Sequence, residues 1–146
     1  MSNYVLDTSA LLAYIESEEG ADQVEALFMN ALDGNDVLFI SIVTCIEVFY
    51  ISSQEQGNVI ARDRFKLIES LPLAQEPLNQ QLTIIVGEIK ASKTMSFADS
   101  CIAGLAKFKN AILVHKDPEF EQIEDEVRQF KLKYKKSVKK KFGQGK

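Results

Sequence analysis

The feature of this sequence that most constrains its fold is an apolar run that ends in a carboxylate. The segment Tyr4-Val5-Leu6 is typical of a buried strand, Asp7 follows it directly, and a helical apolar pattern begins after Thr8 and Ser9. Open parallel α/β sheets bind ligands beyond the carboxyl ends of their strands, where turns of this kind lie. The sequence therefore predicts a functional site around Asp7, built from whatever other side chains reach the same edge.

Strand-like runs and helical patterns alternate along the rest of the chain. Buried strands are predicted at 37–40 and 111–114, and edge strands at 71–73 and 130–134. Apolar spacings of three and four predict helices at 11–15, 21–32, 42–56, 60–71, 78–93 and 96–108, with a short helical turn at 119–126. This alternation predicts an α/β fold in which helices cover both faces of a mostly parallel sheet of four to five strands.

Length and composition indicate a single globular domain, which we expect to span residues 1–135 of the 146. The chain is 46% hydrophobic and 26% charged, as is usual for soluble proteins. Cys45 and Cys101 lie in apolar segments without metal-binding spacing, which predicts free thiols and argues against zinc. Because the sequence shows no leader-like start and no apolar run of about 18 residues, we expect a cytoplasmic protein.

The C-terminal segment differs in charge from the body of the chain. The net charge is −4, yet residues 128–146 include lysines and an arginine and no acidic residue. Such a segment contacts phosphate groups or forms a solvated, disordered terminus. We expect residues 136–146 to form a basic, disordered tail. Contact of this tail with phosphate groups stays open as the alternative.

Four carboxylates occupy positions that parallel topology would bring to one edge of the sheet. Asp7 ends the first strand, and Asp117 comes shortly after the strand at 111–114. Glu47 lies in the second turn of the helix that follows the strand at 37–40, on a largely apolar face. Asp99 lies in the first turn of the helix at 96–108.

Each of these acids also has an ordinary structural interpretation. Asp7 is a candidate N-cap of the first helix, and Asp117 before Pro118 suits a turn or an N-cap. Asp99 forms a capping-box pattern with Ser96. Glu47 is the hardest to explain in this way, since an ionised carboxylate on an apolar face needs a cation or a basic partner. An ion pair with an arginine or lysine is the alternative there.

Carboxylates gathered in one cleft repel one another and require a counter-charge. A divalent cation supplies it, and Mg²⁺ prefers hard oxygen ligands while keeping sites for water and substrate phosphate. Such a centre suits metal-assisted attack of water on a phosphodiester bond.

These motifs resemble the PIN-domain ribonucleases and, in size, the VapC-type toxins of toxin–antitoxin pairs. The resemblance covers residues 3–134 and is carried by Val5-Leu6-Asp7-Thr8-Ser9, by Gly87-Glu88-Ile89-Lys90, and by segments 41–48, 96–103 and 113–120. It implies a three-layer α/β/α fold with strand order 3-2-1-4-5. It also implies an RNA substrate, Mg²⁺ or Mn²⁺, a possible antitoxin partner and a homodimer.

The resemblance also implies roles for individual residues. The metal-binding and catalytic acids would be Asp7, Glu47, Asp99 and Asp117. Supporting polar residues would be Thr8, Ser9, Ser41, Thr44, His115 and Glu119. Lys131, Lys133, Lys135 and Lys139 are candidate contacts to the RNA backbone.

His115 departs from the family pattern, which usually has threonine or serine two residues before its last acid. A histidine there would hydrogen-bond a metal-bound water, act as a ligand, obstruct the pocket, or serve the structure alone. A structural role is the commoner one for a lone histidine.

Three functional hypotheses follow from these residues. The first is a metal-dependent endoribonuclease, acting either as a toxin held by an antitoxin or as a stand-alone RNA-processing enzyme. The second is a phosphate-handling domain, which is disfavoured because a receiver domain needs adjacent acids and a dehalogenase-type phosphatase needs Asp-x-Asp, whereas position 9 is Ser9. The third is a non-catalytic interaction module that keeps the fold.

Overall fold

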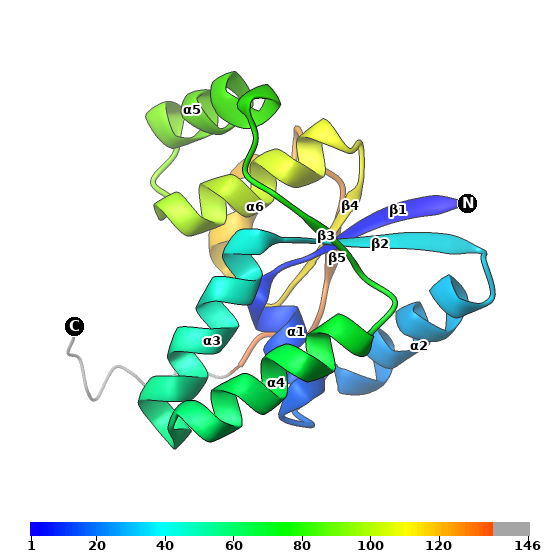
Figure 1. Cartoon of the computed structure of the whole chain (residues 1–146). Helices are drawn as coiled ribbons and strands as arrows, with labels where there is room; N and C mark the ends of the chain where they lie inside the picture. Colours follow the sequence, from blue (N-terminus) through cyan, green and yellow to red (C-terminus); the bar gives the residue numbers. More distant parts are fainter. Residues whose placement is uncertain (136–146) are drawn as a thin grey trace.

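A parallel five-stranded sheet forms the centre of the protein, as shown by a computed structural model that describes residues 1–135 (Figure 1). The strands are β1 Ser2–Leu6, β2 Asp36–Ser41, β3 Ala74–Glu76, β4 Ile112–His115 and β5 Gln129–Lys131. The helices are α1 Thr8–Ile15, α2 Ala21–Leu32, α3 Ile42–Gln56, α4 Asn58–Ser70, α5 Thr83–Ser92 and α6 Phe97–Phe108, with 3₁₀ segments η1 Gln80–Leu82 and η2 Pro118–Ile123. Within residues 1–135, none of the helices has the length and apolar character that a bilayer crossing requires.

The strands lie in the order β3-β2-β1-β4-β5, and every neighbouring pair is parallel. The predicted order 3-2-1-4-5 is therefore confirmed. The chain begins in the middle of the sheet, moves outward through β2 to β3, and then returns to the other side of β1 as β4. The strand order reverses between β1 and β4, and the carboxyl ends of the strands at such a reversal are where ligands bind in open α/β sheets.

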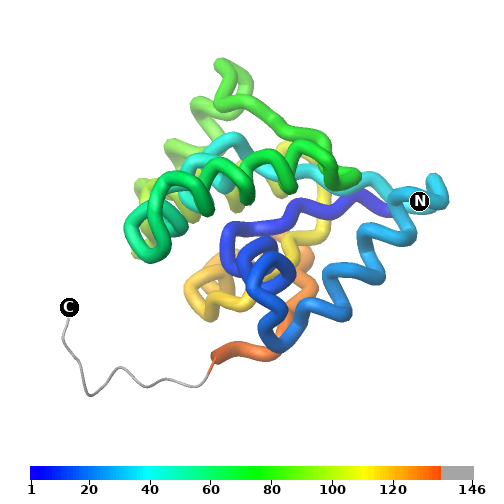
Figure 2. The backbone as a smooth tube through the Cα atoms, turned by 60° about the horizontal axis from the view of Figure 1, so that its bottom comes forward, coloured from blue at the N-terminus to red at the C-terminus, as the bar shows by residue number. Residues whose placement is uncertain are grey.

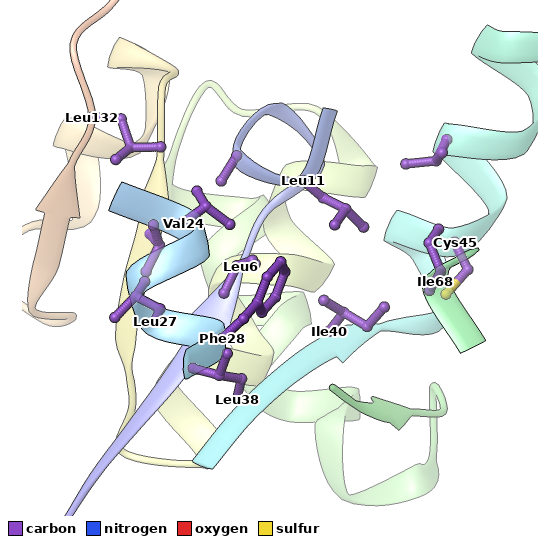
Figure 3. Close-up of a cluster of buried hydrophobic side chains, with 13 residues drawn as sticks. Leu6, Leu11, Val24, Leu27, Phe28, Leu38, Ile40, Cys45, Ile68 and Leu132 are labelled. Carbon is purple, nitrogen blue, oxygen red and sulfur yellow. The ribbon is translucent and has the colours of Figure 1, made fainter. Parts of the chain in front are cut away.

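Alternate residues of the central strands enter two separate cores. Leu6 and Val114 pack on the side of α1 to α4, whereas Val5 and Leu113 pack on the side of α6 and η2. Figure 1 shows α5 and α6 above the sheet and α1 to α4 below it. Figure 3 shows the first core, in which Phe28 of α2 lies between strand residues Leu6 and Leu38. Both faces are therefore covered, as predicted for a three-layer fold.

The two edge strands differ from the prediction in position and length. The strand predicted at 71–73 is wrong by three residues, since β3 pairs with β2 through Ala74–Glu76. Pro72 has no amide hydrogen, and Leu73 N–H donates to Leu71 O at 2.7 Å, so the chain turns there before it can pair. β5 ends at Lys131, although Leu132 N–H still donates to His115 O at 2.8 Å. Pairing stops there because His115 is the last residue of β4.

Two helical glycines with different surroundings allow a matched stability test. A Cβ at Gly104 of α6 would lie 2.5 Å from Val86 Cγ2 of α5, while one at Gly87 of α5 would meet nothing within 4 Å. Because valine is stiff at χ1, we expect Gly104→Ala to reduce the free energy of unfolding by about 1–3 kcal/mol. Gly87→Ala should raise it by about 0.5–1 kcal/mol, since alanine has the better helix propensity. Urea denaturation of both variants measures the difference, and equal effects would contradict the close packing of α5 on α6.

Candidate metal centre at the carboxyl edge of the sheet

Asp7 lies directly after β1 and serves as the N-cap of α1. Its side chain is 2% exposed, and Oδ1 accepts the amide hydrogen of Ala10 at 2.8 Å. Ser9 Oγ lies 2.8 Å from both carboxylate oxygens and also accepts the backbone N–H of Lys116 at 2.9 Å. The predicted capping role is therefore present, and the same carboxylate is tied through Ser9 to the end of β4.

Burial raises the pKa of Asp7 from 3.8 to about 7, because the ionised form loses its hydration. The hydrogen bonds from Ala10 and Ser9 oppose this rise, and the nearby charge of Asp117 adds to it. A carboxyl group in this state is partly protonated at neutral pH. A cation placed beside it would therefore displace a proton.

Glu47 is held against the first strand-to-helix turn by a threonine. Ser41 caps α3, its Oγ accepting Val43 N–H at 3.0 Å, and this sets the start of the helix that carries Glu47. Thr8 Oγ1 donates to Glu47 Oε1 at 2.6 Å, and Thr44 Oγ1 lies 3.3 Å from the same hydroxyl. None of the ion pairs within residues 1–135 includes Glu47. The alternative of a basic partner for Glu47 thus finds no support in the structure.

Three further acids meet at the start of α6 and η2. One ligand-capable oxygen from each of Asp99, Asp117 and Glu119 lies within 4.8 Å of the others. Asp117 Oδ1 also caps η2 by accepting Glu119 N–H at 2.9 Å. Asp99 N–H donates to Ser96 Oγ at 3.0 Å, but the described part of the chain shows no return bond from Ser96 N–H to the Asp99 carboxylate. The capping box is half formed, and the Asp99 carboxylate turns toward the other acids.

The crowding of these acids changes their protonation. Burial, a hydrogen bond with Glu119 and the charges of Asp117 and Asp7 together raise the pKa of Asp99 from 3.8 to about 8, with burial the largest cause. Two carboxyl groups joined by a hydrogen bond share a proton. The site therefore holds bound protons where a divalent cation would otherwise supply the counter-charge.

The donor set fits a hard divalent cation. Asp7, Asp99, Asp117 and Glu119 are carboxylates that influence one another's charge, and Glu47 is hydrogen-bonded to Thr8, the residue next to Asp7. Among residues 1–135, no lysine or arginine forms an ion pair with any of these five acids. Oxygen ligands without a basic partner are the ligands that Mg²⁺ and Mn²⁺ prefer. Glu119, expected only as a supporting residue, lies in the tightest group of acids.

His115 is fully buried at the end of β4, and both of its ring nitrogens have partners within the chain. Nδ1 accepts Asp117 N–H at 3.1 Å, and Nε2 lies 2.8 Å from Gln129 Oε1. The ring packs against Phe120 and Tyr134. Burial lowers the pKa of His115, which favours the neutral ring that these contacts require. These contacts favour the structural role over that of a metal ligand.

Lys116 is a buried residue of the site that sequence reasoning missed. The residue is 8% exposed, and its Nζ donates to the backbone carbonyl of Glu19 at 2.7 Å. Its backbone N–H donates to Ser9 Oγ, which holds Asp7. Lys116 therefore ties β4 to the turn between α1 and α2. A lysine placed between a buried strand and an aspartate was the available signal, but its partner is 97 residues away.

The lysines predicted to contact RNA have acidic neighbours. Lys131 pairs with Glu124 at 2.8 Å, Lys133 with Glu19 at 3.4 Å, and Lys135 with Glu18 at 3.2 Å. Figure 2 shows this last described segment, in orange, passing beside the turn between α1 and α2. Exposed pairs of this kind contribute little to stability and exchange readily. Lys139 and the predicted tail at 136–146 lie outside the described residues.

Residues 4–126 match the family model of the PIN domain, so the chain belongs to the PIN-domain family. A comparison with the curated proteins finds none that matches at the sequence level.

Solved structures of VapBC proteins share the fold. VapBC2 from Rickettsia felis, bound to a DNA fragment from its promoter, is similar over 89% of this chain and 98% of its own, with 20% identity and a TM-score of 0.72. DNA-bound VapBC from Salmonella typhimurium is similar over 90% of this chain and 98% of its own, with 22% identity and a TM-score of 0.72. VapC20 from Mycobacterium tuberculosis, described as a sarcin-ricin loop cleaving toxin, is similar over 82% of this chain and 93% of its own, with 15% identity and a TM-score of 0.62.

Proposed function

We propose that this PIN-domain protein is a divalent-metal-dependent endoribonuclease of the VapC toxin type. The observation that carries the proposal is the meeting of carboxylates from separate elements at the reversal point of the sheet, with the pKa of Asp7 raised to about 7 and that of Asp99 to about 8. Structural ion-pair networks include bases, whereas within residues 1–135 no lysine or arginine forms an ion pair with this group. Clustered acids with raised pKa values are typical of sites that bind a cation for catalysis.

The proposed chemistry assigns different tasks to the acids. Asp7, Asp99 and Asp117 would hold Mg²⁺ or Mn²⁺, with Glu47 and Glu119 as further ligands or proton acceptors. The cation, when bound, neutralises charge on the phosphate and lowers the pKa of a water. Ser9 and Thr8 keep the carboxylates of Asp7 and Glu47 in place by hydrogen bonds.

RNA is the proposed substrate because VapC20, a protein of the same fold, is described as cleaving the sarcin-ricin loop. We propose that Lys131, Lys133 and Lys135 contact the RNA backbone by exchanging their acidic neighbours for phosphates, and Lys139 remains a candidate of the same kind. Simultaneous replacement of the first three by alanine should weaken RNA binding and reduce its dependence on salt. Binding isotherms at several salt concentrations measure this.

An antitoxin is the proposed protein partner, since several proteins of this fold occur in VapBC toxin–antitoxin complexes. A homodimer, implied by the family resemblance, and a cytoplasmic location, expected from the sequence, belong to the same proposal. Co-expression with the product of a neighbouring small gene, followed by purification through a tag on one partner, tests the complex. Light scattering of the purified chain tests the dimer. The stand-alone nuclease gains support if no partner is retained and RNA is still cut.

Cleavage of RNA by the purified protein tests the proposed activity. A mixture of structured and single-stranded RNAs would be incubated with Mg²⁺, with Mn²⁺ or with EDTA, beside the variant Asp99→Asn. We expect products with either metal, none with EDTA, and a strong loss in the variant. If neither the wild-type protein nor the variant cut any RNA with either metal, the chain would be a non-catalytic module instead.

A further inference from the structure

His115 connects the last acid of the site to two other elements by an ordered series of hydrogen bonds. Asp117 N–H donates to Nδ1 at 3.1 Å, and Nε2 lies 2.8 Å from Gln129 Oε1. Gln129 Nε2 in turn donates to the backbone carbonyl of Phe120 at 2.6 Å. The series joins the end of β4 to β5 and to η2, so it encloses the turn on which Asp117 and Glu119 lie.

The directions of these bonds fix the form of the ring. Because a backbone amide can only donate, Nδ1 must present its lone pair, and the ring hydrogen resides on Nε2. Nε2–H then donates to Gln129 Oε1, which leaves the Gln129 amide group to donate to Phe120. Every polar atom in this buried series has a partner, so the arrangement is well determined.

The same bonds exclude the ring from direct contact with a cation. His115 is 0% exposed, and its ring packs against Phe120, at a centroid distance of 5.0 Å, and Tyr134, at 6.1 Å. Its effect on the site therefore has to pass through Asp117. The amide of Asp117 is held by the ring, and one oxygen of Asp117 is occupied as the cap of η2, so the other oxygen has a fixed direction.

We propose that His115 is a positioning residue, which holds the Asp117 backbone through Nδ1 and thereby aims the Asp117 carboxylate at the cation. This inference rests on the proposed function. Outer partners of metal ligands typically change metal affinity by about 10–100-fold. The imidazole of this chain does so through a backbone amide of the ligand residue, in place of the hydroxyl that the family usually has at this position.

Three substitutions separate the two ends of the ring. His115→Asn places an acceptor oxygen on Cγ, where Nδ1 is attached, and so keeps the bond to Asp117 while losing the bond to Gln129. His115→Gln reaches toward Gln129 and loses the bond to Asp117. His115→Phe keeps the ring volume and removes both bonds. All three are expected to lower the melting temperature of the metal-free protein, because each leaves a buried polar group without its partner.

The test is Mn²⁺ affinity by calorimetry, with the melting temperature and the hydrogen exchange of the Asp117 amide measured on the same metal-free samples. We expect His115→Asn to keep Mn²⁺ affinity within about threefold of the wild type, and His115→Gln and His115→Phe to lose about tenfold or more. The Asp117 amide should exchange faster in the last two only.

Three results would overturn the inference. Wild-type affinity in all three variants, or a loss of affinity that follows the fall in melting temperature whichever bond is kept, would show that His115 does not act through Asp117. If the wild-type protein bound no Mn²⁺, the proposed function would fail and the inference with it. The first two results leave the proposed function intact, so the two failures are distinguishable.

Discussion

Replacement of Asp7 by asparagine is expected to abolish RNA cleavage and, at pH 8, to make the metal-free protein more stable. Asparagine keeps the acceptor oxygen for Ala10 N–H, and its amide hydrogens can donate to Ser9 Oγ, so the start of α1 should be retained. The negative charge is lost. A charged metal ligand stabilises the transition state more than the bound substrate. We therefore expect the loss of this ligand to reduce the cleavage rate by at least about 100-fold.

The gain in stability follows from the burial of the same group. At pH 8 the wild-type carboxyl group, with a pKa of about 7, is mostly ionised and is 2% exposed. A neutral amide removes this cost, and we expect the melting temperature to rise by about 2–4 °C per kcal/mol gained. Greater stability combined with lost activity is typical of functional sites.

Thermal melts in EDTA and cleavage assays on the same samples measure both effects of the Asp7 substitution. Asp63→Asn, on an exposed position of α4, is the matched control and should change neither quantity. Full activity in Asp7→Asn would remove Asp7 from the site. Lost activity with a lower melting temperature would indicate a damaged fold rather than a missing ligand.

The metal-free protein should lose stability as the pH rises from 6.5 to 8. Asp7 and Asp99 have folded pKa values of about 7 and about 8 against an ordinary value of 3.8. In this window the folded chain therefore binds more protons than the unfolded chain, and the free energy of unfolding decreases with pH. The loss begins above the ordinary value and ends once the pH has passed the pKa of Asp99; between pH 6.5 and 8 it is on the order of 2 kcal/mol.

The titration of His115 sets the lower end of the pH range in which the effect of the two aspartates can be measured alone. Burial lowers its pKa, so below 6.5 the unfolded chain binds an additional proton at this residue, and the contribution of His115 to the free energy of unfolding rises with pH and opposes that of the aspartates. Above 6.5 the effect of the two aspartates remains. Melts between pH 6.5 and 8 in EDTA measure the slope, and Mn²⁺ should flatten it because a bound cation takes the place of the protons. A flat profile in EDTA, or one that rises with pH, would contradict the raised pKa values.

The parallel sheet and the placement of Asp7 and Asp117 at one edge could be predicted because they depend on local signals, whereas the strand order followed from the family resemblance. Strands that end in aspartate and alternate with helices lead to parallel topology, and this brings Asp7 and Asp117 to one edge. Asp99 was ambiguous for a physical reason. A capping box and a site carboxylate share the pattern Ser-x-x-Asp, and only the structure shows that Ser96 receives the amide while the carboxylate turns away.

The features that sequence missed depend on contacts between distant residues. The apolar neighbours of Glu47 suggested a basic partner or a cation, yet its hydrogen-bond donor is the hydroxyl of Thr8, 39 residues earlier. The partners of His115 and Lys116, Gln129 and Glu19, lie on other elements and carry no pattern of their own. The edge strand β3 was misplaced because apolar character suggested Leu71-Pro72-Leu73, whereas backbone hydrogen bonds select the polar Ala74–Glu76.

Titration of the metal-free protein with Mn²⁺ at pH 7.5, with the released protons counted, tests the proposed metal centre most directly. We expect saturable binding with release of about one proton, since Asp7 and Asp99 hold protons that a cation displaces. The release should fall in Asp99→Asn, together with the affinity. Binding without proton release, or no binding at all, would contradict a cation site built on these carboxylates.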